Sequence, residues 1–294
     1  MQIGIDLGAT KIESVLLDAE GSELHRSRKA SPQNYKDTIV SITESVNLIE
    51  KKFKKKFNVG VCHPGSTNID SGLIQNANNS PWLNNMNFTD DISKNLKRKV
   101  LCENDANCFS LSESYDGAAK NYKVVFGVIL GSGCGGGLVV ENKILVGPNA
   151  FAGEWGHVPF PNSENNYTIE DHVSGKGLEK LYFKKYKEKL VAKDIFLNSR
   201  KNSTKEKVFV KEFLDKLGLS LSILINFIDP DAIVFGGGVS KEIESLDELK
   251  KITEKYLENI NNLKISDLRT VFLKPKYGDA SGVRGAARLG VSEQ

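Results

Sequence analysis

Short apolar runs open the chain and recur in its middle, which predicts two similar sets of strands. Runs near the start predict an antiparallel meander at residues 2–7, 12–17 and 22–29. Apolar residues spaced by three to four positions predict a helix next, at Ile39, Ile42, Val46 and Ile49. Further strands and helices are predicted at 58–62, 88–96, 99–102 and 105 to about 119. The first part of the chain thus combines a meander with strand-helix crossovers.

The same order of elements is predicted again after Asn121. A second meander is expected at 124–130, 137–141 and 143–146. Helices and strands follow at 176–186, 205–228, 232–235, 246–260, 270–273 and from 280 onward. This repetition predicts an internally duplicated α/β fold. We expect domains at 1–120 and 121–294, with a final helix at about 280–294 that can pack on the N-terminal domain.

The composition limits the class of protein. An apolar content of 39% with 26% charged residues is typical of a soluble globular chain, and 294 residues suffice for two domains with separate cores. Lys and Arg together number 40 against 37 Asp and Glu, which gives no electrostatic case for a nucleic-acid partner. We interpret the Lys-rich stretches at 51–56 and 176–211 as solvated faces.

Targeting signals and cysteine spacing indicate the compartment. No apolar run approaches the roughly 20 residues of a membrane span, and the chain starts on a predicted strand instead of a signal peptide. The four cysteines have no C-x-x-C spacing and lie in or beside apolar segments, which is typical of reduced core residues. We therefore expect a cytoplasmic protein without a membrane partner.

Three glycine-bearing loops carry the candidate phosphate chemistry. The first follows Asp6, which could hold Mg²⁺ directly or through water, and consists of Gly8, Ala9, Thr10 and Lys11. The second runs from 131 to 137 and offers backbone amides to an anion, beginning with Gly131, Ser132 and Gly133. The third could admit adenosine without a side-chain clash at Gly236, Gly237 and Gly238. One glycine-bearing turn is weak evidence, whereas three in this order are more specific.

Asp105 stands at a predicted strand-to-helix junction, in the segment Glu103-Asn104-Asp105-Ala106-Asn107. A carboxylate there has a rigid support, and with the glycine loops it suggests phosphoryl transfer. The alternative is that Asp105 only caps the helix, as Asp commonly does. Neither a Walker A loop nor a G-x-G-x-x-G strand-helix unit is present to explain nucleotide binding in another way.

These segments together resemble the ROK family of sugar kinases, within the actin-like ATPase fold, and most of all its bacterial fructokinase and N-acetylglucosamine kinase branches. The likeness runs from Gly4 to the segment 278–287 and includes 103–107, 131–137, 152–157, 229–231 and 236–238. It implies a two-lobed fold with duplicated mixed sheets, an interlobe cleft, and ATP-dependent phosphorylation of a hexose with ATP and Mg²⁺ as cofactors. A homodimer is also implied by the resemblance.

The resemblance also implies roles for single residues. Asp105 would be the catalytic base, and Asn104 would bond a neighbouring sugar hydroxyl. The remaining positions that match the family's sugar site are Gly65, Asn78, Glu154, His157 and Glu170. Each has an alternative: Glu154 and His157 could form a local surface pair, Glu170 could be an acidic residue of a first helical turn, and Asn78 could be a turn residue.

The chain departs from the family pattern in three places. The stretch 158–170 lacks the cysteine cluster with which most members bind structural zinc, so we predict no zinc and leave His157 free as a sugar ligand. Ala9 and Ser132 stand where the family usually has Gly and Thr. Ala9 requires a negative φ, and Ser132 keeps the hydroxyl.

Fructose is the first-choice substrate, with phosphorylation at the 6-position, on likeness at 76–84, 152–157 and near the C-terminus. N-acetylglucosamine is the alternative, supported by 104–109 and 135–138, with glucose or mannose behind it. A sugar-sensing transcriptional regulator of the same family is disfavoured, because the first phosphate loop begins within a few residues of Met1 and leaves no room for a DNA-binding domain.

Overall fold

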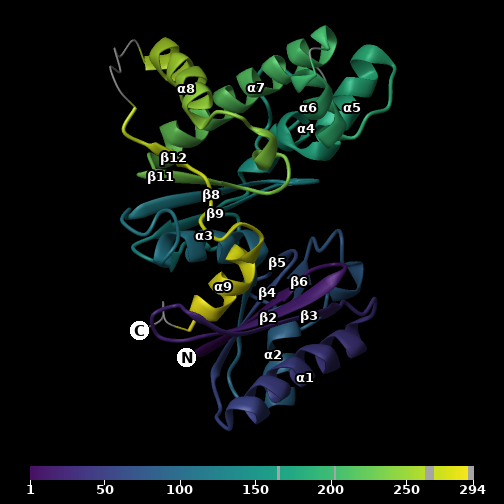
Figure 1. The fold of residues 1–294 in the computed structure, drawn as a ribbon, viewed down its shortest axis with the longest axis vertical. Coiled ribbons are helices and arrows are strands. Elements are labelled where there is room, and N and C mark those ends of the chain that lie inside the picture. Colours follow the sequence, from purple (N-terminus) through teal and green to yellow (C-terminus); the bar gives the residue numbers. More distant parts are fainter. Residues whose placement is uncertain (164–165, 202, 262–267, 291–294) are drawn as a thin grey trace. The chain divides into compact units, whose positions relative to one another are not determined.

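A computed structural model describes residues 1–163, 166–201, 203–261 and 268–290 (Figure 1). Contacts within the chain group it into two compact units. Unit 1 comprises Met1–Lys123, Gly137–Ala152 and Lys276–Gln294, and unit 2 comprises Val124–Gly136 and Gly153–Pro275. Each unit is therefore assembled from segments that are distant in sequence.

Unit 1 contains a five-stranded mixed sheet in the order β3-β2-β1-β4-β7. Its strands are β1 (Gln2–Leu7), β2 (Lys11–Leu17), β3 (Glu23–Ala30), β4 (Asn58–His63) and β7 (Leu101–Asn104). The first three form the predicted antiparallel meander, while β1, β4 and β7 run parallel. A small ribbon of β5 (Ser66–Thr67) and β6 (Ile74–Gln75) follows β4, and η1 (Pro81–Leu83) follows the ribbon.

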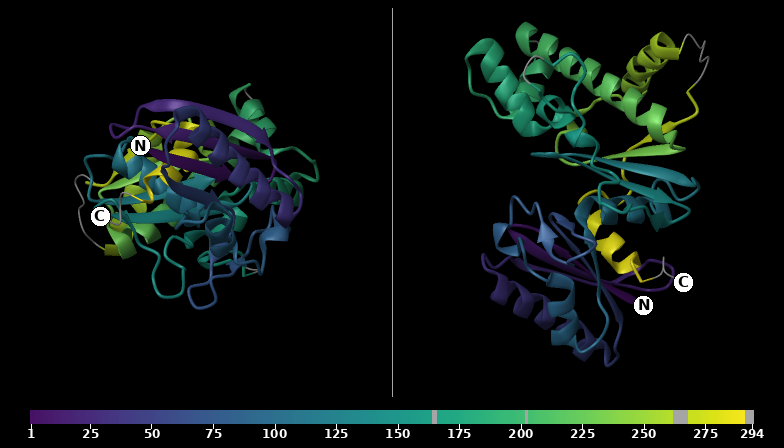
Figure 2. Two further views of the ribbon diagram at one scale, coloured as in Figure 1. Left: turned by 90° about the horizontal axis from the view of Figure 1, so that it is seen from below. Right: turned by 180° about the vertical axis from the view of Figure 1, so that it is seen from behind.

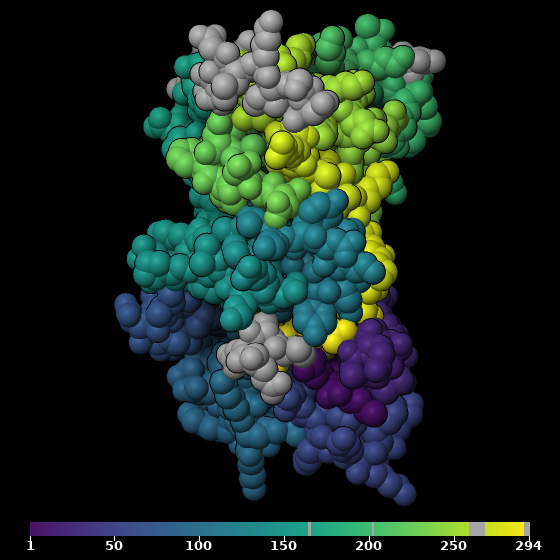
Figure 3. All heavy atoms as spheres, turned by 90° about the vertical axis from the view of Figure 1, so that its left-hand side faces the viewer, coloured from purple at the N-terminus to yellow at the C-terminus, as the bar shows by residue number. Residues whose placement is uncertain are grey.

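Helices cover both faces of this sheet (Figures 1 and 2). Helices α1 (Tyr35–Phe53) and α2 (Phe88–Leu96) bury their apolar sides on one face, against β1 and β4. On the other face α9 (Ser281–Arg288) packs on β1, β2 and β4, and α3 (Asp105–Tyr115) packs on α9. The yellow atoms of the C-terminal segment accordingly lie beside the purple atoms of the first strands in Figure 3.

Glycine allows α9 to approach the sheet and α3 this closely. A Cβ at Gly4 would lie 2.1 Å from the carbonyl oxygen of Val283, and one at Gly60 would lie 1.9 Å from that of Ala286. On α9 itself, a Cβ at Gly285 would lie 1.8 Å from the carbonyl oxygen of Cys108. Any larger residue at these positions would push α9 away from its neighbours.

The second sheet repeats the first. Its order is β10-β9-β8-β11-β12, which corresponds strand by strand to the order in unit 1 and confirms the predicted duplication. Its strands are β8 (Val124–Leu130), β9 (Cys134–Val140), β10 (Lys143–Ile144), β11 (Ala232–Gly236) and β12 (Val271–Leu273). Strands β8, β11 and β12 are parallel, and β9 passes from unit 2 into unit 1 after Gly136.

The remaining elements lie between the strands of the second sheet in the chain and belong to unit 2, apart from one turn of 3-10 helix. They are η2 (Trp155–His157), α4 (Ile169–Val173), α5 (Gly175–Tyr186), α6 (Ala192–Arg200), α7 (Thr204–Ile228), η3 (Ser240–Glu242) and α8 (Leu246–Asn261). The exception, η4 (Gly278–Ala280), precedes α9 in unit 1. Across the described ranges, none of the helices combines the length and the apolar character that a membrane crossing requires.

Several predicted boundaries were wrong. Strand β9 begins at Cys134, inside the predicted glycine loop, so that the loop is three residues long. Strand β7 continues to Asn104, and α3 ends at Tyr115 because Asp116 and Gly117 follow. Helix α6 was not predicted, since its apolar residues lie within a Lys-rich stretch. The predicted final helix is described only as far as Gly290; residues 291–294 lie outside the described ranges.

Candidate functional site

Three predicted site residues of unit 1 lie at the same edge of its sheet. Asp6 stands near the carboxyl end of β1, Gly65 follows the end of β4, and Asp105 follows the end of β7. Because β1, β4 and β7 are adjacent parallel strands, their carboxyl ends meet at one edge, where ligands bind in open α/β sheets. Unit 1 therefore brings together residues that are up to 99 positions apart in sequence.

The N-cap residue at this edge is Asn104, and Asp105 shares one of the capped amides, that of Ala106. The side-chain oxygen of Asn104 accepts hydrogen bonds from the amides of Ala106 and Asn107, at 2.8 and 3.4 Å. Asp105 is the first helical residue, it is exposed, and its Oδ1 accepts the Ala106 N–H at 2.8 Å. With the cap supplied by its neighbour, the Asp105 carboxylate remains on the surface of the edge.

Asn104 also ties this edge to the loop after β4. Its Nδ2 donates to the carbonyl oxygen of Gly65 at 2.8 Å. Gly65 has φ +81°, and a Cβ there would lie 2.4 Å from the carbonyl oxygen of Gln75, so only glycine fits. Asn78 lies in the neighbouring turn, where its backbone N–H donates to the Asn76 carbonyl. The side chain of Asn78 is exposed. Gly65, Asn78, Asn104 and Asp105 thus belong to one cluster of loops.

Asp6 is held by a thiol. The Cys62 Sγ–H donates to its Oδ1 at 3.1 Å across the β1-β4 pair. Burial raises the pKa of the Asp6 carboxyl, and Glu13 adds to the rise, while Cys62 and Lys11 oppose it. The sequence signalled Asp6 but gave no sign that a cysteine orients it.

The first glycine-bearing loop is a tight turn between β1 and β2. The Gly8 N–H donates to the Lys11 carbonyl at 2.9 Å. Ala9 is absent from the described residues with positive φ, as its side chain requires. Lys11 lies 3.7 Å from the buried Glu13, so its ammonium has a partner within the protein.

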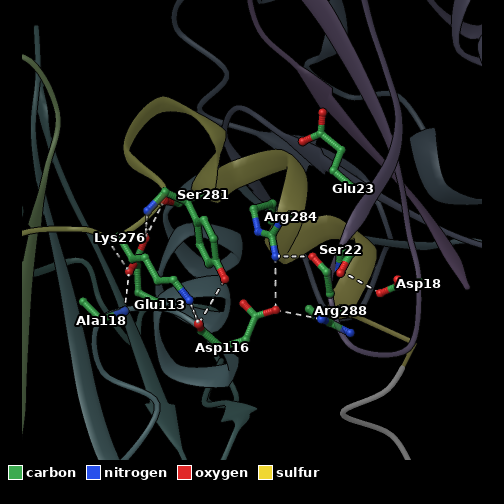
Figure 4. A network of polar contacts seen from close by, with 12 residues as sticks. Asp18, Ser22, Glu23, Glu113, Asp116, Ala118, Lys276, Ser281, Arg284 and Arg288 are labelled. Carbon is green, nitrogen blue, oxygen red and sulfur yellow. Dashed lines mark hydrogen bonds and ion pairs between the residues drawn. The ribbon is translucent and has the colours of Figure 1, made fainter.

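Helix α3, which begins at Asp105, is fixed to α9 by buried polar groups (Figure 4). Glu113 is fully buried, and its carboxylate accepts hydrogen bonds from the amides of Ala118, Lys276 and Tyr277 and from the Ser281 hydroxyl. The donor distances lie between 2.7 and 3.2 Å.

Asp116 lies just beyond the end of α3 and pairs with two further residues of α9. Arg284 and Arg288 donate to its Oδ2 at 3.2 and 2.7 Å. Together with Glu113, this contact gives the helix that carries Asp105 a rigid support.

In unit 2 the other two glycine loops lie side by side. Gly131 follows the end of β8, and Gly237 follows the end of β11, its parallel neighbour. Gly237 has φ +87°, and a Cβ there would lie 2.4 Å from the carbonyl oxygen of Leu130. The Val239 N–H donates to the same oxygen at 2.8 Å. The second and third loops predicted from the sequence therefore adjoin each other.

Both loops line one cavity of about 670 Å³. A Cβ at Gly131 or Gly238 would meet nothing within 4 Å, which leaves the backbone open to a ligand. The start of α5, the region around α6 and η3 form the rest of the wall, and sequence reasoning missed these residues: Lys176, Glu179, Val191, Ala192, Lys193, Phe196, Val239, Lys241 and Glu242. No motif marked any of them, and the helix α6 itself was not predicted.

Glu154 and His157 form the local pair that was considered as an alternative to a ligand role. The His157 Nδ1 lies 3.2 Å from Glu154 Oε2, and both side chains are exposed. Trp155 anchors the turn between them, since its Nε1–H donates to the Gly135 carbonyl at 3.0 Å and its ring meets Phe126 edge-on. The segment therefore presents both polar side chains outward from a fixed base.

The stretch that lacks the cysteine cluster is closed by backbone pairing. The Phe160 N–H donates to the Tyr167 carbonyl at 2.8 Å, and the Ile169 N–H donates to the Val158 carbonyl at 2.9 Å. The His172 ring packs against Phe160 and Tyr167, with centroids 4.1 and 5.7 Å away. In the part of the chain that the structure describes, no group of three or more His, Cys, Asp or Glu is placed to hold a metal ion.

Glu170 joins this stretch to the second glycine loop. Its Oε2 accepts the Cys134 N–H at 2.7 Å. The residue lies in the first turn of α4, as the alternative interpretation held, but its carboxylate points to the loop. Unit 2 therefore groups Glu170 with Gly131, Ser132 and Gly133.

The model of the ROK family matches residues 2–293 of this chain. Over 306 aligned residues the chain is 36% identical to an N-acetyl-D-glucosamine kinase from Pectobacterium atrosepticum, with 98% of each protein covered.

Solved structures show the same fold. A ROK hexokinase from Thermus thermophilus has a TM-score of 0.86 at 22% identity and covers 100% of this chain and 99% of its own. A ROK family glucokinase from Streptomyces griseus, in complex with glucose and AMPPNP, has a TM-score of 0.77 at 25% identity and covers 98% of each. The two repeated sheets and these neighbours establish the two-lobed actin-like ATPase fold.

Proposed function

Because this chain belongs to the ROK family, we propose that it is an ATP-dependent N-acetylglucosamine kinase. It is a sugar kinase, a phosphotransferase between ATP and a hexose. The finer proposal rests on the relative that is 36% identical over 98% of the chain and is an N-acetyl-D-glucosamine kinase. Fructose, the first choice from the sequence, is not confirmed.

In this proposal Asp105 accepts the proton of the attacking sugar hydroxyl as the oxygen bonds to the γ-phosphorus and ADP leaves. The exposed carboxylate at the rigid start of α3 supports the role, since phosphoryl transfer needs mainly positioning and charge neutralisation from the protein. The proposed sugar-binding residues of unit 1 are Gly65, Asn78 and Asn104. For unit 2, taken by itself, we propose Glu154, His157 and Glu170.

The nucleotide belongs, in our proposal, to the cavity between the two glycine loops of unit 2. Its volume of about 670 Å³ falls in the range of small-molecule sites. The open faces of Gly131 and Gly238 suit close contact with phosphate and adenosine. Lys176 and Lys193 in its wall supply positive charge beside the phosphates. In unit 1, the turn from Gly8 to Lys11 is our proposed phosphate-binding segment.

Asp6 is our proposed magnesium residue. Mg²⁺ is usually held by one or two carboxylates together with water and substrate phosphates, without a full protein cage. A single partly exposed carboxylate fits that mode. When bound, the ion neutralises charge on the phosphates.

We also propose a homodimer, which light scattering of the purified protein tests.

A hexose panel with coupled detection of ADP tests the substrate. N-acetylglucosamine, fructose, glucose and mannose are compared at equal concentrations, with the Asp105→Asn variant as the background control. We expect the highest kcat/KM for N-acetylglucosamine. Turnover of fructose with none of N-acetylglucosamine would restore the ranking inferred from the sequence and overturn this proposal.

A further inference from the structure

The loop at 131–134 is held to the start of α4 and α5 by three hydrogen bonds. The Gly175 N–H donates to the Gly131 carbonyl at 2.8 Å, and the Lys176 N–H donates to the Ser132 carbonyl at 3.2 Å. The third bond, from the Cys134 N–H to Glu170 Oε2 at 2.7 Å, runs in the opposite direction. It is the one bond of the three that depends on a side chain.

The packing around the third bond is tight. A Cβ at Gly133 would lie 2.9 Å from Glu170 Oε2, so the loop backbone lies directly against the carboxylate. Hydrogen bonds to an ionised acceptor are roughly twice as strong as neutral ones. Glu170 therefore fixes the end of the loop at which β9 begins, while the α5 amides fix its start.

These contacts turn two of the loop amides, those of Ser132 and Gly133, away from α5, because each shares a trans peptide with a carbonyl that faces the α5 amides. The carbonyl oxygens of Gly131 and Ser132 are turned to the α5 amides, and both residues line the 670 Å³ cavity. Among the described residues, the amides of Ser132 and Gly133 donate no backbone hydrogen bond. Holding the carbonyls back in this way directs N–H groups at an incoming phosphate.

We propose that Glu170 positions the loop at 131–134 for phosphate binding, in addition to its proposed role as a sugar ligand. One carboxylate oxygen holds the Cys134 amide, and the other is available to a sugar hydroxyl. Sugar bound at Glu170 restricts the carboxylate and so orders the loop that receives the nucleotide. The effect of bound sugar on the loop rests on the function proposed above. The positioning of the loop by the hydrogen bond from Cys134 to Glu170 does not depend on that function.

Nucleotide binding in the absence of sugar tests the hold on the loop. Calorimetry with Mg²⁺ and AMPPNP compares the intact protein with Glu170→Ala, Glu170→Gln and Glu188→Ala. Loss of one charge-assisted hydrogen bond predicts about tenfold weaker binding for Glu170→Ala. Glu170→Gln keeps an acceptor oxygen for the Cys134 amide, so we expect a change within about twofold. Glu188→Ala is the matched control, because its exposed carboxylate pairs with Lys205 and does not line the cavity.

Amide hydrogen exchange of the peptide covering 131–136 gives a second readout. We expect faster exchange in Glu170→Ala and unchanged exchange in Glu170→Gln and Glu188→Ala. Glu170→Met, which keeps the side-chain volume but offers no acceptor, replaces the alanine variant should that variant unfold. AMPPNP binding by Glu170→Ala at the affinity of the intact protein would overturn the proposal, as would equal losses in Glu170→Ala and Glu188→Ala.

The link to the sugar has its own test. The hexose that is turned over in the panel should tighten AMPPNP binding to the intact protein and not to Glu170→Ala, and by reciprocity AMPPNP should tighten sugar binding by the same factor. An equal gain in both proteins would refute the link. Failure of N-acetylglucosamine as a substrate would sink the proposed function alone, because the sugar-free measurements do not depend on it.

Discussion

Replacing Asp105 by Asn separates its catalytic role from a structural one. Asn104 already caps α3 through two amides, so the variant keeps the cap. The carboxylate is exposed and contributes mainly through the positive helix terminus, worth about 0.3–1 kcal/mol. For a chain of this size, that corresponds to a fall in Tm of about 2 °C or less.

The same substitution should reduce kcat far more than stability. Removing a general base typically costs about 10²–10⁴ in rate. Because Asn has nearly the same shape, we expect the KM values for sugar and ATP to change little. The assay is steady-state kinetics with ADP detection, accompanied by thermal unfolding of both proteins.

Asn104→Ala is the matched control for this experiment. It removes the cap of α3 and the bond to the Gly65 carbonyl, so it should cost about 1–3 kcal/mol of stability. Because Asn104 is also a proposed sugar ligand, Asn104→Ala should lower Tm and raise the KM for the sugar, whereas Asp105→Asn should mainly lower kcat. Near-normal kcat in Asp105→Asn would refute the assignment of the base, whatever the stability.

Other predictions follow from single contacts. Gly237→Ala places a Cβ 2.4 Å from the Leu130 carbonyl at φ +87°, so Tm and AMPPNP affinity should both fall; an unchanged Tm would contradict the geometry. Glu113→Ala leaves four donors unpaired in a buried site, and urea unfolding should show a loss of about 3–5 kcal/mol. Burial lowers the pKa of His172 to about 4, with a further decrease from Lys216. Because the unfolded imidazole takes up a proton near pH 6.5, stability from this group is complete above that pH and is lost as pH falls from about 6.5 toward 4. Urea midpoints at pH 7 and 5 for the intact protein and His172→Phe measure that loss, and equal pH dependence would contradict it. Metal analysis should find no stoichiometric zinc, and zinc removable only by strong chelation would contradict that prediction.

Local patterns of apolar residues predicted most elements of the fold. The apolar runs at 2–7 and 124–130 predicted strands with the observed bounds, and the repeated order of such runs predicted the duplication. Helix α6 was missed because exposed lysines mask its apolar residues Ala192, Ile195 and Phe196. The start of β9 was missed because glycine has no apolar side chain to signal a strand, although backbone pairing accepts it.

The sequence predicted which residues belong to the candidate site. It did not predict the hydrogen bonds among them. Asp105 and Asn104 are neighbours in sequence, yet which of them caps α3 depends on backbone angles and on the Gly65 carbonyl. The bond from Cys134 to Glu170 joins residues 36 positions apart, and no period in the sequence records it.

By itself the sequence determined most of the strand and helix order, the three glycine-bearing loops and the family, because these depend on local periodicity and on residue types at fixed spacing. Only the tertiary structure decided that the segment from 137 joins unit 1. It also decided that parallel strands bring Asp6, Gly65 and Asp105 to one sheet edge. Pairing of distant strands and close packing of helices depend on which surfaces meet. The pattern of apolar residues along the chain shows that a strand or helix is buried, but it does not specify which other element packs against it.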